Sequence, residues 1–487
     1  MSLLALSGTN SASGGYDIDN SLKLEPDNSE YLSITNTSAG NRRTATYSFW
    51  LKRTELDASS YMQVAGLFTT SETTRFMFYQ DHIMLENGNG GTRKRLTTNA
   101  LYRDTSAFYH FVVAIDTTQS TAANRVKLYV NGVQETSFST EEYPDQNFDL
   151  AIGQSGANFP WRYGAYNATY YKTAGYLAEA HYIDGTQYAA SDFGEFDEDS
   201  GILKPKEFTG TYGTQGSYLN FSDASNLGAN PKGSDIDAVL NNITSANAAV
   251  DSPTNNFAIL SHAMQGYYED QWSIISDGGT KFRCTEFDVW ITTVSSIGVT
   301  KGKWYAEFQP TGARPNNMYG IASMEQLDNN SGYIYGGYLG ESGETWGIGY
   351  YQTNGNLFKQ QNSGYTLTTG FGSSISQNQK VGVAIDMDNH NLYIAINNTW
   401  QNSGDPTSGA TGTGAISFDD TETVAFGLSG YSLGSGNDTI VSVNFGGYRT
   451  GGMPSINSTD ANGYGVFRYA PPSGYYALCT KNLEEFG

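Results

Sequence analysis

The side chains best suited to bind a ligand are tyrosine and tryptophan residues in two segments, 159–171 and 333–346. Both segments interleave aromatic rings with Gly or Asn, as exposed recognition loops do. Such rings offer a large amphipathic contact area for little loss of conformational entropy, and their faces stack on sugar rings or protein partners. Two interpretations stay open, because the same rings also suit a core or a subunit interface. The candidate residues are Trp161, Tyr163, Tyr166, Tyr333, Tyr335, Tyr338 and Trp346.

A pair of carboxylates is the other chemistry that the sequence could support. A glycosidase needs two carboxyl groups about 5–10 Å apart, and Glu341 and Glu344 lie among the rings of the second segment. A solvated loop explains both residues better, and the 49 acidic residues supply such pairs by chance. We therefore predict that the chain is not an enzyme, with glycosidase or depolymerase activity as the alternative.

Metal and cofactor sites have little support in the sequence. The five histidines are scattered without a His-x-x-x-His pair, and His110 and His181 fall in expected strands, where a structural role is favoured. Asp116, Asp386 and Asp388 end expected strands beside oxygen-rich turns. Calcium is one interpretation of these aspartates and an Asx-turn is the other. We predict no cofactor, with calcium left open.

Two similar hairpins indicate how these side chains are positioned. Segments 112–116 and 126–131 form the first, and segments 381–386 and 392–397 form the second. In each, an apolar strand ends at an Asp and returns as alternating Leu-Tyr-Val/Ile, the pattern of a strand with one buried face. With 56 Gly, 35 Tyr and 24 Phe, the composition predicts an all-β chain of two related antiparallel β-sandwich, or jelly-roll, domains.

Further strands follow from alternation of apolar residues. Tyr47, Phe49 and Leu51 are expected on one face of a strand, and Trp50 on the other. The remaining strands are expected at 31–34, 64–68, 76–79, 83–86, 148–152 and 175–183, and at 272–276, 282–289, 303–308, 319–322, 346–351, 424–428 and 440–446.

The domain boundaries follow from changes in composition. We expect one sandwich with an N-terminal arm over residues 1–205, a connector over 206–265 and a second sandwich over 266–487. From about Phe193 the chain becomes acidic, at Asp192–Asp199, and is then rich in Asn, Ser, Gly and Ala through the connector. It is expected to be ordered, with a strand near 216–221 and packing by 239–243.

Charge excludes one class of partner. The net charge of −22 argues against nucleic acid, whose binding depends on clustered cations. The basic runs Arg42-Arg43 and Arg93-Lys94-Arg95 are isolated and are expected in solvated loops. No membrane span and no signal peptide are expected. Cys284 and Cys479 are expected to be buried free thiols.

Two families resemble parts of the chain. Segments 47–53, 111–116 and 127–133, ending in Leu-Tyr-Val-Asn-Gly-Val, resemble the laminin-G and concanavalin-like family over about residues 25–205. Segments 302–308, 320–322, 381–386 and 443–446 resemble the SPRY domain in order and spacing. The second resemblance departs at Asn397-Asn398, where the SPRY family has Asn-Gly, so a differently built turn is expected there.

The whole chain also resembles a bacteriophage virion architecture, through segments 21–32, 251–257 and 469–483. The resemblance implies a tail fibre or receptor-binding protein on the virion surface, assembled in the host cytoplasm. Its implied partners are other virion proteins, sister copies in a homo-oligomer with trimers favoured, and a host surface glycan or protein. A capsid decoration or head-fibre protein is the structural alternative, and a polysaccharide depolymerase is the enzymatic one.

Overall fold

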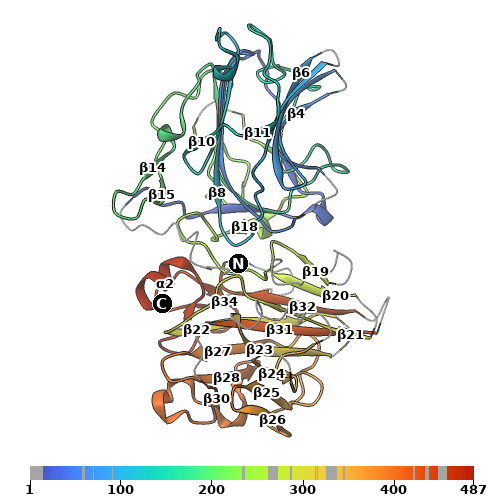
Figure 1. Ribbon diagram of the computed structural model, residues 1–487, viewed down its shortest axis with the longest axis vertical. Coiled ribbons are helices and arrows are strands. Elements are labelled where there is room, and N and C mark those ends of the chain that lie inside the picture. Colours follow the sequence, from blue (N-terminus) through green and yellow to red (C-terminus); the bar gives the residue numbers. More distant parts are fainter. Residues whose placement is uncertain are drawn as a thin grey trace. The chain divides into compact units, whose positions relative to one another are not determined.

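The computed structural model describes residues 15–56, 61–69, 71–89, 92–232, 236–261, 273–285, 288–312, 314, 316–324, 337–343, 346–419, 423–433, 438–447 and 458–487. The described chain divides into two compact units, the first ending at Asn255 and the second beginning at Asn256. Each unit is a sandwich of two antiparallel sheets, so the predicted fold class is confirmed (Figure 1).

The first unit contains one sheet centred on β3, which we call the β3 sheet. Its strands are, in spatial order, β10 (Val133–Glu135), β9 (Val126–Val130), β8 (Tyr109–Asp116), β3 (Thr44–Arg53), β13 (Gly175–Asp184), β1 (Ser21–Leu24) and β18 (Ala248–Ala249), with β16 (Ser217–Leu219) also paired to β13.

The facing sheet of this unit is centred on β5, and we call it the β5 sheet. Its strands are, in spatial order, β11 (Phe138–Glu141), β7 (Thr92–Thr98), β6 (His82–Asn89), β5 (Glu72–Tyr79), β4 (Tyr61–Phe68), β12 (Trp161–Tyr163), β2 (Tyr31–Ile34) and β17 (Val239–Asn241). Residues 148–152, expected as a strand, form no strand, although Leu150 and Ile152 are buried.

Alternating side chains fill the space between these two sheets. Phe49, Phe76 and Phe111 pack there with ring centroids 5.1–5.7 Å apart. Trp50 lies on the opposite face of β3, as predicted, and stacks on His110 at 4.6 Å. The outer face of the β3 sheet is covered by a second apolar cluster that includes Phe193 and Phe208.

The segment expected as a connector belongs to the first sandwich. Strands β16, β17 and β18 pair with β13, β2 and β1, and the expected strand near 216–221 is therefore present. Lys52 Nζ lies 2.9 Å from Asp251 Oδ2 in a buried ion pair. The first sandwich thus extends to Asn255 rather than ending near residue 205, because these strands complete the edges of both of its sheets.

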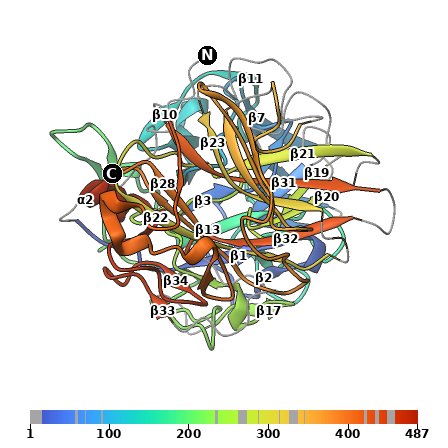
Figure 2. The same cartoon turned by 90° about the horizontal axis from the view of Figure 1, so that it is seen from below.

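The second unit also has two sheets. The β27 sheet contains β19 (Ser273–Ser276), β20 (Lys281–Cys284), β32 (Thr439–Asn444), β22 (Lys303–Pro310), β27 (Val381–Asp386), β28 (Asn391–Ile396) and β29 (Thr399–Trp400), with β30 (Ile416–Ser417) on β28 and β35 (Tyr476–Ala477) on β22. The β23 sheet contains β21 (Val289–Val294), β31 (Val424–Ser432), β23 (Asn317–Ser323), β24 (Gly347–Tyr351), β25 (Leu357–Gln361) and β26 (Gly364–Thr368). Figure 2 labels β22 and β28 of the former sheet and β23 and β31 of the latter.

The remaining described elements are short. They are the strand pairs β14 (Gly194–Phe196) with β15 (Leu203–Pro205) and β33 (Ser458–Thr459) with β34 (Val466–Phe467), the 3-10 helices at Pro26–Asn28, Ala122–Asn124, Ala190–Asp192, Ser245–Asn247, Gln401–Ser403 and Pro406–Thr411, and the α-helix α2 (Thr480–Phe486). Cys284 and Cys479 are buried and are not joined in a disulfide, as predicted.

The two predicted hairpins are β8–β9 and β27–β28, and each is followed by the same turn. Asn131 and Gly132 have φ of 47° and 80°, and Asn397 and Asn398 have φ of 47° and 66°. Both central residues of a type I′ turn need positive φ, which Gly and Asn adopt most readily. The expectation of a differently built turn at Asn397 is therefore wrong, because Asn398 replaces glycine in the same geometry.

Candidate functional site

Two of the predicted site residues belong to the core. Trp161 and Tyr163 occupy alternate positions of β12, and both point between the sheets. The ring of Trp161 stacks on that of Tyr182, with centroids 5.6 Å apart, and lies 5.4 Å from the ring of Tyr47. The expectation of a surface role for Trp161 and Tyr163 is corrected, because their period-2 spacing places them on the buried face of the strand.

The predicted site residues of the second segment lie in three different places. Trp346 is buried in the core of the second unit, edge-on to Phe418 at 5.9 Å, so its expected surface role is also corrected. Tyr338 is half-buried on the outer face of the β23 sheet. Tyr333 and Tyr335 lie outside the described residues, as does Glu344.

Tyr166 lies in a line of rings on the outer face of the β5 sheet, which we call the aromatic row. Its members are Tyr79, Tyr61, Tyr171, Tyr166 and Phe68. Successive ring centroids in this order are 4.4, 5.2, 6.1 and 4.9 Å apart. All five side chains are half-buried, and the neighbouring Tyr170 is 57% exposed. The row follows β4 over seven residue steps, a length of about 23 Å.

Hydrogen bonds hold the loop that supplies Tyr166 and Tyr171 of the row and the neighbouring Tyr170. Gln63 of β4 donates from Nε2 to the carbonyl of Ala165 at 3.2 Å, and Thr173 donates from Oγ1 to the carbonyl of Gln63 at 2.8 Å. Asn167 Oδ1 accepts from the backbone N–H groups of Thr169 and Tyr170 at 2.8 and 2.9 Å. The rings are therefore held in place before any ligand arrives, which lowers the entropic cost of binding.

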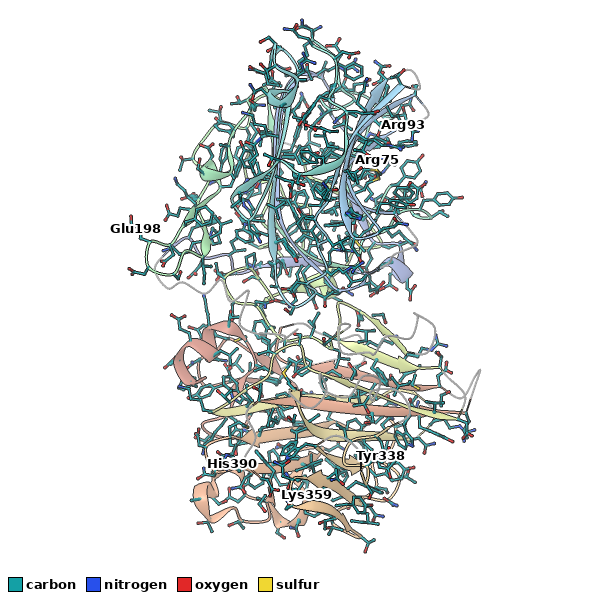
Figure 3. The ribbon with its side chains drawn as sticks, viewed as in Figure 1. Arg75, Arg93, Glu198, Tyr338, Lys359 and His390 are labelled. Atoms are coloured by element: carbon teal, nitrogen blue, oxygen red, sulfur yellow. The ribbon has the colours of Figure 1, made fainter. Side chains whose placement is uncertain are left out.

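A cluster of three arginines lies beside the Phe68 end of the row, and we call it the arginine cluster. Strand register places Arg75 opposite Glu86 and Glu86 opposite Arg95. Glu86 contacts Arg75, Arg95 and Arg93 at 2.8, 2.7 and 3.4 Å. Three guanidinium groups thus surround one buried carboxylate, which leaves two positive charges in excess. Figure 3 shows Arg75 and Arg93 close together on this sheet.

Phe68 joins the aromatic row to the arginine cluster. The guanidinium carbons of Arg75 and Arg93 lie 4.6 and 5.1 Å from its ring centroid, within the range of a cation–π contact. A Cβ at Gly66, which pairs with Arg75, would lie 2.5 Å from Arg75 Cβ. Glycine at position 66 therefore leaves room for Arg75 to lie flat over the sheet.

A surface pocket opens between these groups. It includes Phe68, Thr73, Gly88 and Arg93 in its lining and measures about 180 Å³ with its open mouth included. Within the described part of the chain, Oγ1 of Thr73 and Nη1 of Arg75 are buried without a hydrogen-bond partner. Burial lowers the pKa of Arg75, and the nearby Glu86 opposes that shift.

A second group of rings lies on the outer face of the β23 sheet. Trp290 lies 5.2–6.0 Å from the rings of Tyr338, Tyr351 and Tyr431, and Tyr338 meets Phe358 at 5.4 Å. These rings surround apolar side chains that include Met318 and Leu339. Among the residues that the structure describes, no cluster of arginines like that of the β5 sheet contacts this patch.

The aspartates considered for calcium are used in turns. Asp116 accepts from the backbone and hydroxyl of Thr118 and from Gln119 at 2.6–3.0 Å. Asp386 accepts twice from Asn389 and pairs with Lys303 at 3.0 Å. Glu341, considered as a catalytic acid, accepts from the backbone of Tyr338 at 3.1 Å. No group of three or more His, Cys, Asp or Glu side chains suited to a metal occurs within the ranges described.

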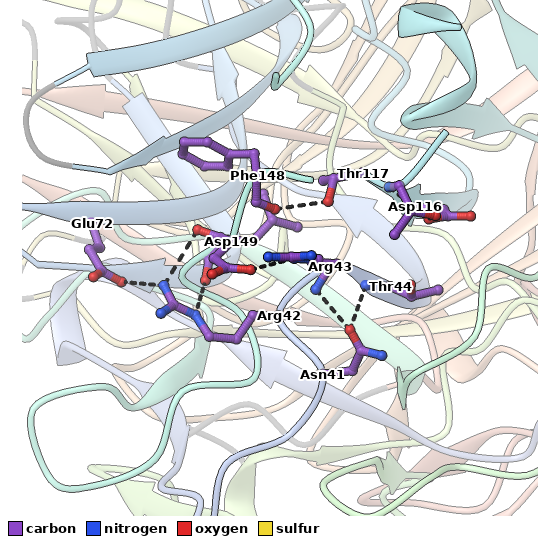
Figure 4. A network of polar contacts seen from close by, with 11 residues as sticks. Asn41, Arg42, Arg43, Thr44, Glu72, Asp116, Thr117, Phe148 and Asp149 are labelled. Carbon is purple, nitrogen blue, oxygen red and sulfur yellow. Dashed lines mark hydrogen bonds and ion pairs between the residues drawn. The ribbon is translucent and has the colours of Figure 1, made fainter. Parts of the chain in front are cut away.

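The sequence did not predict the arginine cluster. Arg93-Lys94-Arg95 was expected in a solvated loop, whereas these residues lie in β7. Arg42 and Arg43 lie outside the strands and are 30% and 44% exposed, as expected for a solvated loop, and they pair with Glu72 at 3.1 Å and Asp149 at 2.6 Å (Figure 4). The available signal was the i, i+2 spacing of Arg93 and Arg95, which places both on one face of a strand.

The first unit presents a row of aromatic rings and a cluster of charged groups on one sheet face, which are groups suited to contact a ligand. Residues 26–169 match a laminin-G model of the concanavalin A-like lectin/glucanases superfamily. The first unit therefore contains a laminin-G/concanavalin-like domain, as the sequence resemblance implied. No helix in the part of the chain that the structure describes is long and apolar enough to cross a membrane.

Comparison with solved structures gives low-identity likenesses for both units. The SPRY domain of human HERC1 is 15% identical, with 36% of this chain and 92% of that chain covered and a TM-score of 0.26. Domains LG4-5 of the mouse laminin α1 chain are 8% identical, with 91% and 93% of the two chains covered and a TM-score of 0.30. A search of the curated proteins finds no match.

Proposed function

We propose that this chain is a non-enzymatic recognition protein whose first sandwich binds a saccharide along the aromatic row. The observation that carries the proposal is the row itself: five half-buried rings in mutual contact on an open sheet face. Rings in a continuous line suit an extended chain of sugar units, whose apolar faces stack on aromatic faces. The match of residues 26–169 to a lectin superfamily supports the same chemistry.

We further propose that the protein acts on the surface of a bacteriophage particle, as a tail fibre or receptor-binding protein. The support is the resemblance of segments 21–32, 251–257 and 469–483 to virion proteins. A host surface glycan would then be the ligand of the aromatic row. Capsid decoration without receptor binding is the alternative role on the same particle.

Glycan-array binding by the whole chain tests the saccharide proposal. Replacement of Tyr166 or Tyr170 by Ala should weaken binding about 5–10-fold each, since one aromatic contact contributes about 1 kcal/mol. The matched control is Tyr365→Ala, which removes another exposed tyrosine, 41% exposed, from β26 of the second unit. Equal loss in the control, or no binding by the wild type to any glycan, would contradict the proposal.

Two further measurements separate the alternatives. Release of reducing ends from a bound polysaccharide would make the protein a depolymerase and overturn the non-enzymatic part of the proposal. Saturable binding to bacterial cells that carry the array-selected glycan, weakened to the same degree by Tyr166→Ala, would support the receptor-binding role. Absence of cell binding by a protein that binds the isolated glycan would favour capsid decoration.

A further inference from the structure

We infer that the arginine end of the aromatic row binds the acidic group of a saccharide, a carboxylate or a sulfate ester, through Arg93 and Thr73. The inference rests on the proposed function and specifies its ligand class. An oxyanion is the chemistry that guanidinium groups and hydroxyl donors recognise together. The sugar units next to the acidic one would then lie along the row.

Charge is the first support for this inference. Arg75, Arg93 and Arg95 share the single carboxylate of Glu86, and an incoming anion would compensate the excess positive charge. Glu72 also borders the pocket, but Arg42 Nη2 lies 3.1 Å from its carboxylate and offsets its charge.

Unused hydrogen-bonding capacity is the second support. Oγ1 of Thr73 is buried and has no partner among the described residues, although Thr73 lines the pocket. A buried donor without a partner is unfavourable for folding, and an anion oxygen that enters beside Thr73 would supply the acceptor missing for its hydroxyl.

The site inferred for the anion lies between Thr73 and Arg93. A Cβ at Gly88 would lie 2.6 Å from the backbone oxygen of Thr92, 3.1 Å from Arg93 Cγ and 3.2 Å from Thr73 Cγ2, so any side chain at position 88 would press on Arg93 and Thr73. The volume of about 180 Å³ includes open solvent, and the enclosed space is about that of one water molecule. It therefore admits one oxygen of an acidic group, and the rest of the saccharide would lie outside it.

The net charge of the chain affects which anionic ligands it attracts. A protein with a net charge of −22 repels polyanions at long range. Capture of an acidic saccharide therefore depends on the local cluster and on ring contacts rather than on general attraction.

Calorimetric titration of the whole chain tests the inference. The probes are oligosaccharides from the glycan array, each in three forms: the uronic acid, its carboxyl-reduced neutral counterpart and a sulfate ester. The wild type should bind an acidic form at least 10-fold more tightly than the reduced form. Arg93→Gln should bring the affinities for the acidic and reduced forms together, because the charge-assisted contact to the acidic group is lost.

Two variants distinguish a ligand contact from a structural role. Thr73→Val removes an unpartnered hydroxyl and should keep or raise the melting temperature while it weakens acidic-form binding several-fold. Arg43→Gln is the matched control and should leave binding unchanged. The side chains of Arg43 and Arg93 are 44% and 37% exposed, and each pairs with one carboxylate.

The outcomes separate this inference from the proposed function. Equal affinity of the wild type for acidic and reduced forms, with Tyr166→Ala still weakening both, would overturn the inference alone. Equal effects of Arg93→Gln and Arg43→Gln would also overturn it. Failure of every saccharide form to bind would overturn both the inference and the proposed function.

Discussion

Arg75 and Glu86 face each other across β5 and β6, where Nε and Nη2 of the guanidinium contact the same carboxylate oxygen at 3.1 and 2.8 Å. The side chains are 6% and 0% exposed, so the charges are held away from water. An ion pair of this kind gives little net stability, but loss of one partner leaves a buried charge uncompensated. The pair therefore fixes where the arginines of the cluster lie.

Glu86→Leu should lower the free energy of unfolding by about 3–5 kcal/mol, because it leaves Arg75 buried without its carboxylate. Denaturant unfolding monitored by tryptophan fluorescence measures the change. The control is Glu72→Leu, whose partner Arg42 is 30% exposed; an exposed pair contributes about 0–1 kcal/mol. Equal losses in the two variants would contradict the special role of Glu86.

Much of the fold could be predicted because alternation of apolar residues reports directly on strand faces. Tyr47, Phe49 and Leu51 face the core and Trp50 faces away, as their spacing indicates. The connector was misjudged because its composition resembles a linker, whereas its role depends on partners distant in sequence. The pairing of β16, β17 and β18 with β13, β2 and β1, and the Lys52–Asp251 ion pair, show that it belongs to the first sandwich.

The candidate site was predicted only in part for a similar reason. Ring-rich composition identified Tyr166, but it did not distinguish core rings such as Trp161 from surface rings. The arginine cluster depends on three strands in register, so that Arg75, Glu86 and Arg95 lie in one line across the sheet. The sequence shows these charged residues, but it does not show the strand register that aligns them.

Asp251→Ala should destabilise the first sandwich by about 3–5 kcal/mol, since it leaves Lys52 buried without its carboxylate partner. Burial lowers the pKa of Lys52, and Asp251 opposes that shift. Thermal unfolding of the whole chain should show one transition moving to lower temperature. Asp237→Ala is the control, because Asp237 lies in the same segment and its carboxylate bonds are exposed. A variant that unfolds like the wild type would show that residues near Asp251 contribute little to the sandwich.

Acid should weaken the first sandwich through His110. Burial lowers the pKa of His110 to about 3, whereas an unfolded histidine has a pKa of about 6.5. The unfolded chain therefore binds the proton first, and the free energy of unfolding falls by about 1.4 kcal/mol per pH unit from about 6.5 toward 3. The double variant Ser48→Ala, His110→Phe removes the imidazole that takes up this proton, together with the hydrogen bond of 2.9 Å between the two side chains. Denaturation at several pH values should show a shallower acid slope in the variant, and parallel slopes would contradict the assignment.

The turn that follows each hairpin should respond to mutation in the same way in both units. Asn131 Oδ1 accepts from His110 N at 2.8 Å, and Asn397 Oδ1 accepts from Lys380 N at 2.9 Å, with both residues at φ of 47°. Asn131→Ala and Asn397→Ala should each cost about 1–3 kcal/mol, because alanine strains this backbone and leaves the amide without its acceptor. Asn398→Gly should be neutral or stabilising, since glycine accepts the positive φ without strain. Calorimetry of the three variants measures these effects, and a costly Asn398→Gly would show that the Asn398 side chain contributes contacts beyond the geometry of the turn.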